Sequence, residues 1–143
     1  MFLLLNIRED VESIYTISGL GDIYVVDEMY NGMFPMLFLG YSKQLDKMFT
    51  FNCSDVRLKD FVEYVVFETT FDMINRSIAF ITDTVTLMRE ARECMIVIID
   101  KESSYLSRHY FCDLKKVGEN YIPKSGKFIF YNKDRINRLK IKD

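Results

Sequence analysis

The feature that most restricts the fold is a pair of strand-like runs on either side of Asn31-Gly32. Residues 21–30 alternate in a strand pattern, and residues 33–39 return as a second apolar run. Asn and Gly both tolerate positive φ, so this dipeptide between two such runs predicts a two-residue hairpin turn. Pro35 cannot donate a backbone hydrogen bond, and we therefore expect the second strand at a sheet edge or bulged near Pro35.

The pattern changes its period after a third strand. Residues 48–53, MFTFNC, complete an antiparallel meander over residues 21–53. Ser54 or Asp55 then stands where a helix N-cap is expected. The following residues, 56–68, carry apolar side chains three and four places apart, which is the spacing of one helix face. These side chains are Leu58, Phe61, Val62 and Val65.

The second half of the chain contains one ambiguous segment and several clearer ones. Residues 71–82 fit a helix as a whole, whereas SIAFIT within them fits a strand, and periodicity does not separate the two. A short helix capped by a Thr or Asp83 is expected next, with Leu87, Met88 and Ala91 facing inward. CMIVIID (94–100) has the composition of a buried strand, and YLSRHYFCDL is expected to pair with it.

The order of these elements predicts an α+β fold. We expect a mainly antiparallel sheet with an N-terminal β-meander, two or three helices in the middle, and C-terminal strands that include residues 127–133. A chain of 143 residues fits a single domain. Residues 132–143 are basic and are expected to form a terminal helix or a tail.

Most of the chain resembles a family of short bacterial proteins known only as a domain of unknown function. The resemblance follows the hairpin, the later helices and the MIVIID strand, and it rests on two short motifs. These are P-x-L-F (Pro35, Leu37, Phe38) and I-P-x-x-G (Ile122, Pro123, Gly126). It implies the same α+β fold, and it carries over no catalytic or binding residue.

Composition indicates a globular protein of a reducing compartment. Hydrophobic residues make up 49% and charged residues 28% of the chain, which is too apolar for disorder. No apolar run approaches the length of about 20 residues that a membrane-spanning helix needs. Three unevenly spaced cysteines do not suggest a disulfide framework. We therefore expect a cytoplasmic protein without a cofactor.

The cysteines and the single histidine require a separate interpretation. Cys53, Cys94, His109 and Cys112 are the ligand types of a structural zinc site, and a Cys–His pair is also the core of a thiol nucleophile. Zinc ligands usually arrive as close pairs on a tight turn, and residues three apart on a strand face opposite sides. We interpret these residues as two or three half-buried thiols and a surface or sheet-face imidazole, and we predict neither a metal site nor a catalytic thiol.

Carboxylates near the ends of two expected strands suggest a third and weaker hypothesis, that the protein is a metal-dependent nuclease. The residues are Asp22, Asp27 and Glu28 around one strand, and Asp100, Lys101 and Glu102 after another. Carboxylates and a lysine gathered from neighbouring strand ends can hold Mg²⁺ and position a water. The same residues are also typical of ordinary strand-to-turn exits. No phosphate-binding glycine motif accompanies them, and we predict that the protein is not an enzyme.

Methionine and aromatic residues gather along the expected hairpin and are candidates for contact with a partner. The candidates are Met29, Tyr30, Met33, Phe34 and Met36, followed by Phe38 and Tyr41. Either helices and a neighbouring strand cover both hairpin faces, or part of this surface adapts to another protein. We favour a small non-enzymatic binding domain that contacts another protein or a second copy of itself. An accessory or inhibitor role in a phage, mobile-element or bacterial defence setting is the expectation.

The basic end of the chain supports the alternative function. Residues 113–143 carry nine Lys and Arg against four Asp and Glu, whereas the rest carries ten against seventeen. Aromatic and basic side chains together suit single-stranded nucleic acids and nucleotides. The candidate contacts are Lys127, Tyr131, Lys133, Arg135 and Arg138. The simpler interpretation is a solvated segment that complements the acidic body.

Overall fold

The sheet follows the chain strand by strand. In the computed structural model, seven strands of the described chain pair in sequence order, and each pairing is antiparallel. The structure describes residues 6–32, 35–55, 61–91, 93–100, 106–113, 123, 125–129 and 137–140. The elements are β1 (Tyr15–Ile17), β2 (Gly21–Asn31), β3 (Pro35–Ser42), β4 (Lys47–Asp55), β5 (Phe61–Thr69), α1 (Phe71–Ile78), α2 (Thr84–Ala91), β6 (Glu93–Asp100) and β7 (Leu106–Asp113).

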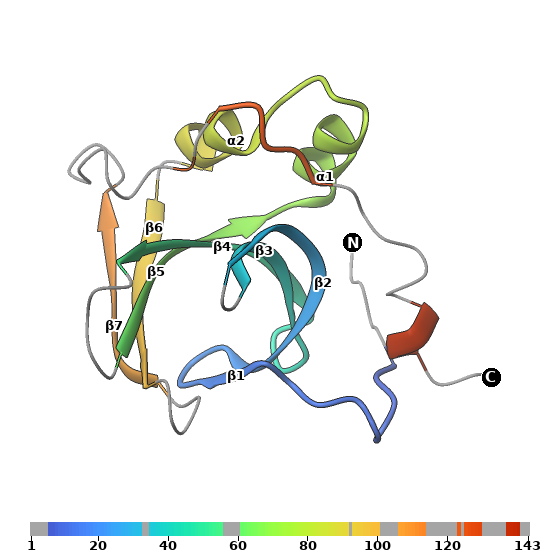
Figure 1. Ribbon diagram of the computed structural model, residues 1–143, viewed down its shortest axis with the longest axis vertical. Coiled ribbons are helices and arrows are strands. Elements are labelled where there is room, and N and C mark those ends of the chain that lie inside the picture. The colour runs from blue at the N-terminus through green and yellow to red at the C-terminus, as the bar shows by residue number, and fades with distance from the viewer. Residues whose placement is uncertain are drawn as a thin grey trace.

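The sheet curls until its first and last strands approach each other. β1 contacts β7, and Figure 1 shows the strands arranged around a central space like the wall of a cylinder. Both helices lie against the outside of this wall (Figure 1). Side chains alternate along a strand, so each strand contributes to the inside and to the outside. A mostly antiparallel sheet with short helices agrees with the expected α+β class.

Apolar side chains fill both sides of the wall. The inner core is formed by Tyr15, Ile17, Leu20, Ile23, Phe38, Phe49, Phe51, Val62, Tyr64, Val66, Met95, Val97 and Ile99. The outer core, which includes side chains of both helices, is formed by Ile7, Tyr24, Val26, Leu39, Tyr41, Met48, Val65, Phe67, Met73, Ile74, Leu87, Met88, Cys94, Ile96, Ile129 and Leu139. Phe38 and Tyr41, two aromatic residues of the hairpin, are therefore core residues.

The prediction of a helix over residues 56–68 is wrong for residues 61–68, which the structure describes. Residues 61–69 form strand β5, which pairs with β4 and β6. Val62, Tyr64 and Val66 belong to the inner core, and Val65 and Phe67 to the outer core. A strand buried on both faces is apolar at nearly every position, so its sequence contains helix-like spacings as well. Residues 56–60 lie outside the described part of the chain.

Of the two alternatives predicted for the strand that contains Pro35, an edge position or a bulge, the structure shows the bulge. β3 pairs with β2 on one side and β4 on the other, so it is not an edge strand. The ladder is irregular at Pro35, because Asn31 faces Pro35 while the preceding residue, Tyr30, faces Leu37. This irregular pairing accommodates Pro35, which has no N–H to donate, inside a strand that is paired on both sides.

The ambiguous segment begins as a helix, and a second helix follows it. α1 covers residues 71–78, and the hydroxyl of Thr70 accepts a hydrogen bond from Met73 N at 3.3 Å as its N-cap. α2 is capped by Asp83, whose Oδ1 accepts from Thr86 N at 3.1 Å, in agreement with the expectation. Leu87 and Met88 are buried, as expected. Within the described chain, no helix has the length and apolar character required to cross a membrane.

The described C-terminal residues pack against the body of the protein. Residues 127–129 belong to no strand, so the strand expected over 127–133 is absent from its described part. Their backbone bonds to the helices instead: Ile129 N donates to Ser77 Oγ at 2.7 Å. Residues 137–139 form a helical turn with Leu139 buried, and Arg8 N donates to Leu139 O at 2.6 Å. The remainder of 132–143 lies outside the described residues.

Two tyrosine hydroxyls form a short chain of hydrogen bonds in the inner core. Tyr64 donates to the carbonyl oxygen of Pro35 at 2.7 Å, and its oxygen lies 2.7 Å from the hydroxyl of Tyr15. A phenol has one proton, so Tyr15 must be the donor to Tyr64. Burial raises the pKa of both Tyr15 and Tyr64 above the ordinary tyrosine value.

We expect Tyr64→Phe to destabilise the protein more than Tyr15→Phe. Removing the Tyr64 hydroxyl deprives both the Tyr15 O–H and the Pro35 carbonyl of a partner, which costs about 2–4 kcal/mol. Removing the Tyr15 hydroxyl leaves the bond from Tyr64 to Pro35 intact and costs about 1 kcal/mol. Urea unfolding of the two variants measures the difference. Equal losses, or a larger loss in Tyr15→Phe, would contradict this donor order.

We also expect the free energy of unfolding to fall above about pH 10. An unfolded tyrosine ionises near this pH. The buried Tyr15 and Tyr64, whose pKa values are raised, keep their protons. The unfolded chain then binds fewer protons than the folded one, and each tyrosine lowers the unfolding free energy by about 1.4 kcal/mol per pH unit. Urea titrations between pH 8 and 11 should show a shallower decline in the double variant Tyr15→Phe, Tyr64→Phe. Parallel declines would contradict it.

Candidate functional site

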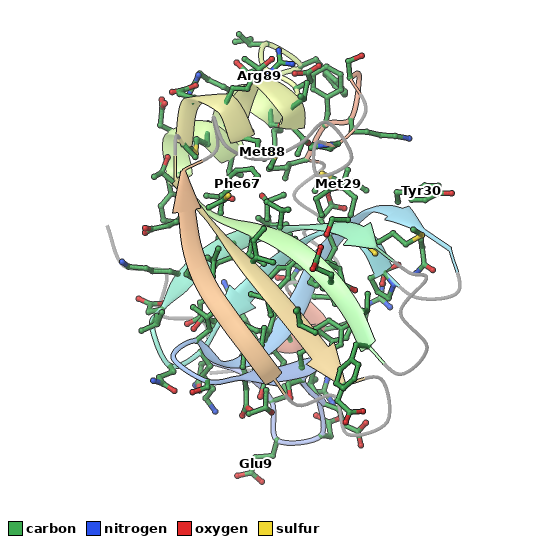
Figure 2. All side chains as sticks on the ribbon, turned by 90° about the vertical axis from the view of Figure 1, so that its left-hand side faces the viewer. Glu9, Met29, Tyr30, Phe67, Met88 and Arg89 are labelled. Carbon is green, nitrogen blue, oxygen red and sulfur yellow. The ribbon has the colours of Figure 1, made fainter. Side chains whose placement is uncertain are left out.

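The hairpin residues predicted to contact a partner differ in their exposure. Met29 is half-buried against the outer core, and the hydroxyl of Thr84 lies 3.4 Å from its sulfur. Tyr30, the next residue, is 51% exposed. Figure 2 places Tyr30 at the outer edge of the molecule. Met36 is half-buried, and the other predicted contacts, Met33 and Phe34, lie outside the described residues. Tyr30 is therefore the described hairpin residue best placed to contact a partner.

Tyr30 meets one residue of the predicted basic set. The ammonium of Lys127 lies 5.5 Å from the centre of the Tyr30 ring, a distance at which a cation is attracted to an aromatic face. The backbone at Lys127 is fixed, because its carbonyl accepts from the N–H and the hydroxyl of Thr84 at 2.7 and 2.8 Å.

The other predicted basic contacts do not join this place. Arg138 is exposed in the helical turn at residues 137–139, which Figure 1 shows apart from the helices α1 and α2. Tyr131, Lys133 and Arg135 lie outside the described residues. The described residues therefore do not form one basic surface.

Helix α1 ends in a turn whose left-handed residue is Phe80. Its φ is 60°, its N–H donates to Ser77 O at 2.9 Å, and the N–H of Ile81 donates to Arg76 O at 2.9 Å. This is the Schellman arrangement, in which the residue after the C-cap, Ala79, is left-handed and usually glycine. A residue with a Cβ atom costs about 1–2 kcal/mol there. The chain therefore holds a phenylalanine in a conformation that phenylalanine disfavours.

The side chains of this turn are exposed. Phe80 is 60% and Ile81 73% exposed, and Ile78 is also exposed at the end of α1. The Phe80 ring packs edge to face on Phe128, with the ring centres 5.2 Å apart. Phe128 follows Lys127, so one short segment joins Phe80 to Tyr30. We call Ile78, Phe80, Ile81, Phe128, Lys127 and Tyr30 the helix-end surface.

Sequence reasoning missed most of this surface. It left residues 71–82 open between a helix and a strand, whereas α1 ends at Ile78 and a turn follows. No glycine marks the end of the helix, which removes the usual signal for a left-handed C-terminal residue. The cap at Asp83, which begins the next helix, was the available sign that α1 had to end early.

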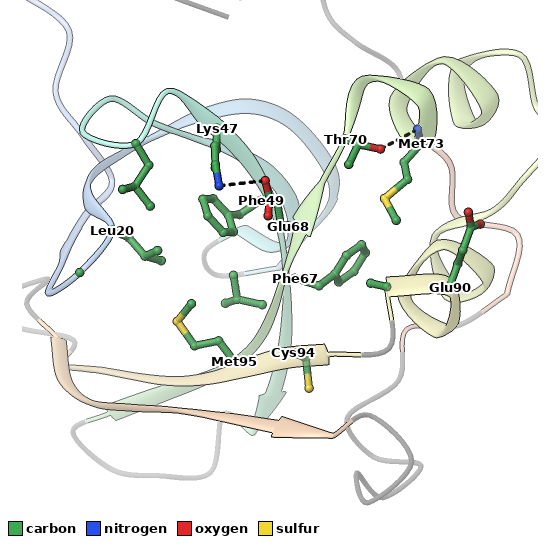
Figure 3. Close-up of a pocket in the computed structure, with 14 residues that line it drawn as sticks. Leu20, Lys47, Phe49, Phe67, Glu68, Thr70, Met73, Glu90, Cys94 and Met95 are labelled. Atoms are coloured by element: carbon green, nitrogen blue, oxygen red, sulfur yellow. Dashed lines mark hydrogen bonds and ion pairs between the residues drawn. The ribbon is translucent and has the colours of Figure 1, made fainter. Parts of the chain in front are cut away.

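A cavity of about 520 Å³ lies on another part of the sheet, at the place where β6 separates from β5 (Figure 3). The ladder between these strands ends at Val66–Met95, while β5 continues to Thr69 beside β4. The cavity is lined by Gly19, Leu20, Leu45, Lys47, Phe49, Val66, Phe67, Glu68, Thr70, Met73, Glu90, Ala91, Cys94 and Met95. These residues come from four separate stretches of sequence, 19–20, 45–49, 66–73 and 90–95, and no local pattern predicts them.

The cysteines and the histidine occupy different places in the sheet. Cys94 faces Cys112 across the β6–β7 ladder, and Val97 faces His109. Cys53 belongs to β4. Cys53 and Cys94 form no disulfide. The side chains of His109 and Cys112 lie outside the described part of the structure. Sequence reasoning did not foresee the cross-strand alignment of Cys94 with Cys112.

The predicted carboxylates make local contacts where they are described. Asp22 accepts from the Thr16 hydroxyl at 2.8 Å, and Glu28 accepts from the Asn31 amide at 2.8 Å. Asp27 is buried, and Asp100 faces Phe61 across the β5–β6 ladder. Lys101 and Glu102 lie outside the described residues. Within the described chain, no three side chains of the ligand types His, Cys, Asp and Glu gather into a metal-binding group.

No protein-family model matches this chain, and no curated protein or solved structure matches it either. The resemblance to short bacterial proteins therefore stays an expectation.

We expect Phe80→Gly to be more stable than Phe80→Ala by about 1 kcal/mol. Both substitutions remove the ring and its contact with Phe128, but only glycine also relieves the left-handed strain. Urea unfolding of the two variants measures the difference without interference from the lost ring. An alanine variant as stable as the glycine variant would mean that residue 80 does not adopt positive φ in solution.

Proposed function

We propose that this chain is a small non-enzymatic binding domain that acts by contacting another protein through the helix-end surface. The observation that carries the proposal is Phe80, a large aromatic residue kept exposed in a strained backbone conformation. Strain of this kind concentrates at functional sites, where the surrounding structure fixes it. An exposed aromatic residue on a fixed backbone is also the type of side chain that anchors protein interfaces.

Hydrogen bonds to several neighbouring segments fix the backbone around Phe80. A fixed backbone favours the binding of a partner. Two hydrogen bonds close the end of α1, and Ser77 Oγ accepts from the N–H of Ile129. The carboxylate of Asp83 accepts from the N–H of Gly126 at 3.0 Å, which ties the segment before Phe128 to the start of α2. A surface ordered before binding loses less conformational entropy when the partner arrives.

The chemistry of the helix-end surface indicates the kind of partner. Its apolar centre suits an aliphatic or aromatic side chain, and Lys127 at its side suits a carboxylate next to that side chain. We therefore propose a protein partner that presents an apolar residue flanked by acid. A second copy of this chain is the other partner within the same proposal. The proposal includes a cytoplasmic location and an accessory or inhibitor role in a phage or bacterial defence setting.

A second candidate function is the binding of a nucleotide or a single-stranded nucleic acid. It is favoured by the contact of Lys127 with the Tyr30 ring, since a basic side chain beside an aromatic face suits a phosphate beside a base. The protein contact has the stronger support, because the more exposed part of the surface is aliphatic and aromatic rather than basic.

Site-specific photo-crosslinking tests the proposal. A photoreactive phenylalanine analogue replaces Ile81 in one version of the full chain and Glu9 in a matched control. Figure 2 shows Glu9 at the end of the molecule opposite α2. We expect light to produce a discrete protein adduct from position 81 and none from position 9 in the cells that naturally make the protein. Where the adduct contains a different protein, an excess of unmodified chain should suppress it, and excess Phe80→Asp, Ile81→Asp should not.

Three outcomes have distinct meanings. An adduct with the mass of two chains identifies self-association, and an adduct of another mass identifies a different protein. No adduct at position 81, or equal adducts at both positions, would contradict the proposal. Circular dichroism of the Phe80→Asp, Ile81→Asp variant provides the folding control, because both side chains are exposed and their replacement should leave the fold intact.

A further inference from the structure

Two cysteines are directly opposed where the hairpin of β6 and β7 is open. Cys94 is the second residue of β6, and it pairs with Cys112, the residue before the last one of β7. The ladder is regular here, since its shift in register lies between Ile98 and Ile99. Opposed residues of an antiparallel pair have Cα atoms about 4.5 or 5.5 Å apart, depending on the hydrogen-bond pattern. Both distances lie within the range of about 4.4–6.8 Å that a disulfide requires.

The two cysteines also occupy the same face of the sheet. Directly opposed residues of an antiparallel pair share one face. Cys94 belongs to the outer core, whereas the next residue, Met95, belongs to the inner core. The register position of Cys112 is therefore on the outer face as well, and a bond between the two cysteines does not have to cross the sheet.

The start of β6 is supported from one side. The ladder between β5 and β6 reaches only to Val66–Met95, so in the described ladders Cys94 pairs with β7 and not with β5. Such a strand end opens locally more readily than a strand that is paired on both sides. Cys94 is 2% exposed, but it lines the cavity of about 520 Å³, and Figure 3 shows it at the end of β6. Local opening beside this space gives a small reagent access to the thiol.

We propose that Cys94 and Cys112 form a reversible cross-strand disulfide, with a low-molecular-weight disulfide such as oxidised glutathione as the oxidant. The thiolate of one cysteine attacks a sulfur of the small disulfide, whose S–S bond breaks and releases a small thiolate. The thiolate of the other cysteine attacks the cysteine sulfur of this mixed disulfide and releases the second small thiolate. Two cysteine thiols are oxidised, one small disulfide is reduced, and the two released thiolates take up the two protons.

The disulfide stabilises the folded chain and responds to the redox state of its surroundings. Residues 95–111 lie between the two cysteines, so the link restricts the unfolded chain over this loop. In the folded chain it fastens the end of β6 to the strand that already pairs with it. In a reducing compartment, such as the cytoplasm proposed above, disulfides are usually transient and sense oxidants. The switch is independent of the helix-end surface.

A redox titration tests the proposal. The folded full chain is equilibrated in mixtures of reduced and oxidised glutathione, free thiols are alkylated, and peptides are mapped by mass spectrometry. We expect one transition from free Cys94 and Cys112 to a peptide pair that links them, reversed by dithiothreitol. Cys53 faces Tyr64 rather than a cysteine, so the Cys53→Ala control should show the same transition. The oxidised control should melt at least about 5 °C above its reduced form.

Two variants remove the link separately. Cys94→Ala and Cys112→Ala should each abolish both the linked peptide and the rise in melting temperature, and the second variant keeps the test valid if the first does not fold. A link that involves Cys53 or joins two chains would overturn the proposal. So would glutathione adducts on both cysteines without a link, a link that forms only in urea, a link that is present at every glutathione ratio or at none, or an oxidised chain that melts no higher than the reduced one.

Discussion

The structure depends on a sheet that must bury both of its faces. Adjacent residues such as Val65 and Val66 on β5 are both buried although they point to opposite sides. One face is covered when the sheet curls around its own side chains, and the other when α1 and α2 lie against it. The curl is tight at Gly40, where an added Cβ would lie 2.8 Å from Ile23 Cγ2 and 3.1 Å from a carbon of Phe51. The Phe38 and Phe51 rings stack at 4.6 Å in this place.

The same constraint explains what the sequence could and could not predict. Alternation is a local signal, and it located β2. The two-residue turn predicted at Asn31-Gly32 is wrong, because Asn31 belongs to β2 and pairs with Pro35. β5 was mistaken for a helix because a strand buried on both sides loses its alternation, and Phe61, Val62 and Val65 then also fit a helical stripe. α2 was predicted correctly because its cap and its buried residues lie within one short segment. The ambiguity of α1 arose from its early end, which no glycine or proline marks.

The candidate surfaces were harder to predict than the fold. Tyr30 was selected for its type, and its exposure agrees with that choice, but its contact with Lys127 joins residues nearly a hundred positions apart. Phe80 becomes unusual only through its backbone angle, which composition does not reveal. The cavity lies where the pairing of β5 with β6 stops at Val66, three residues before β5 itself ends at Thr69. Such a mismatch between strand lengths has no signature in the residues themselves.

Arg76 connects the two candidate surfaces. Its carbonyl accepts from Ile81 N and Thr82 N, at 2.9 and 3.3 Å, and so closes the turn that exposes Phe80. Its guanidinium binds both oxygens of Glu90, a residue of the cavity rim. The two contacts use different parts of the residue, because the backbone carbonyl closes the turn and the side chain binds Glu90. Substituting Arg76 would therefore remove the contact with Glu90 and keep the carbonyl that closes the turn.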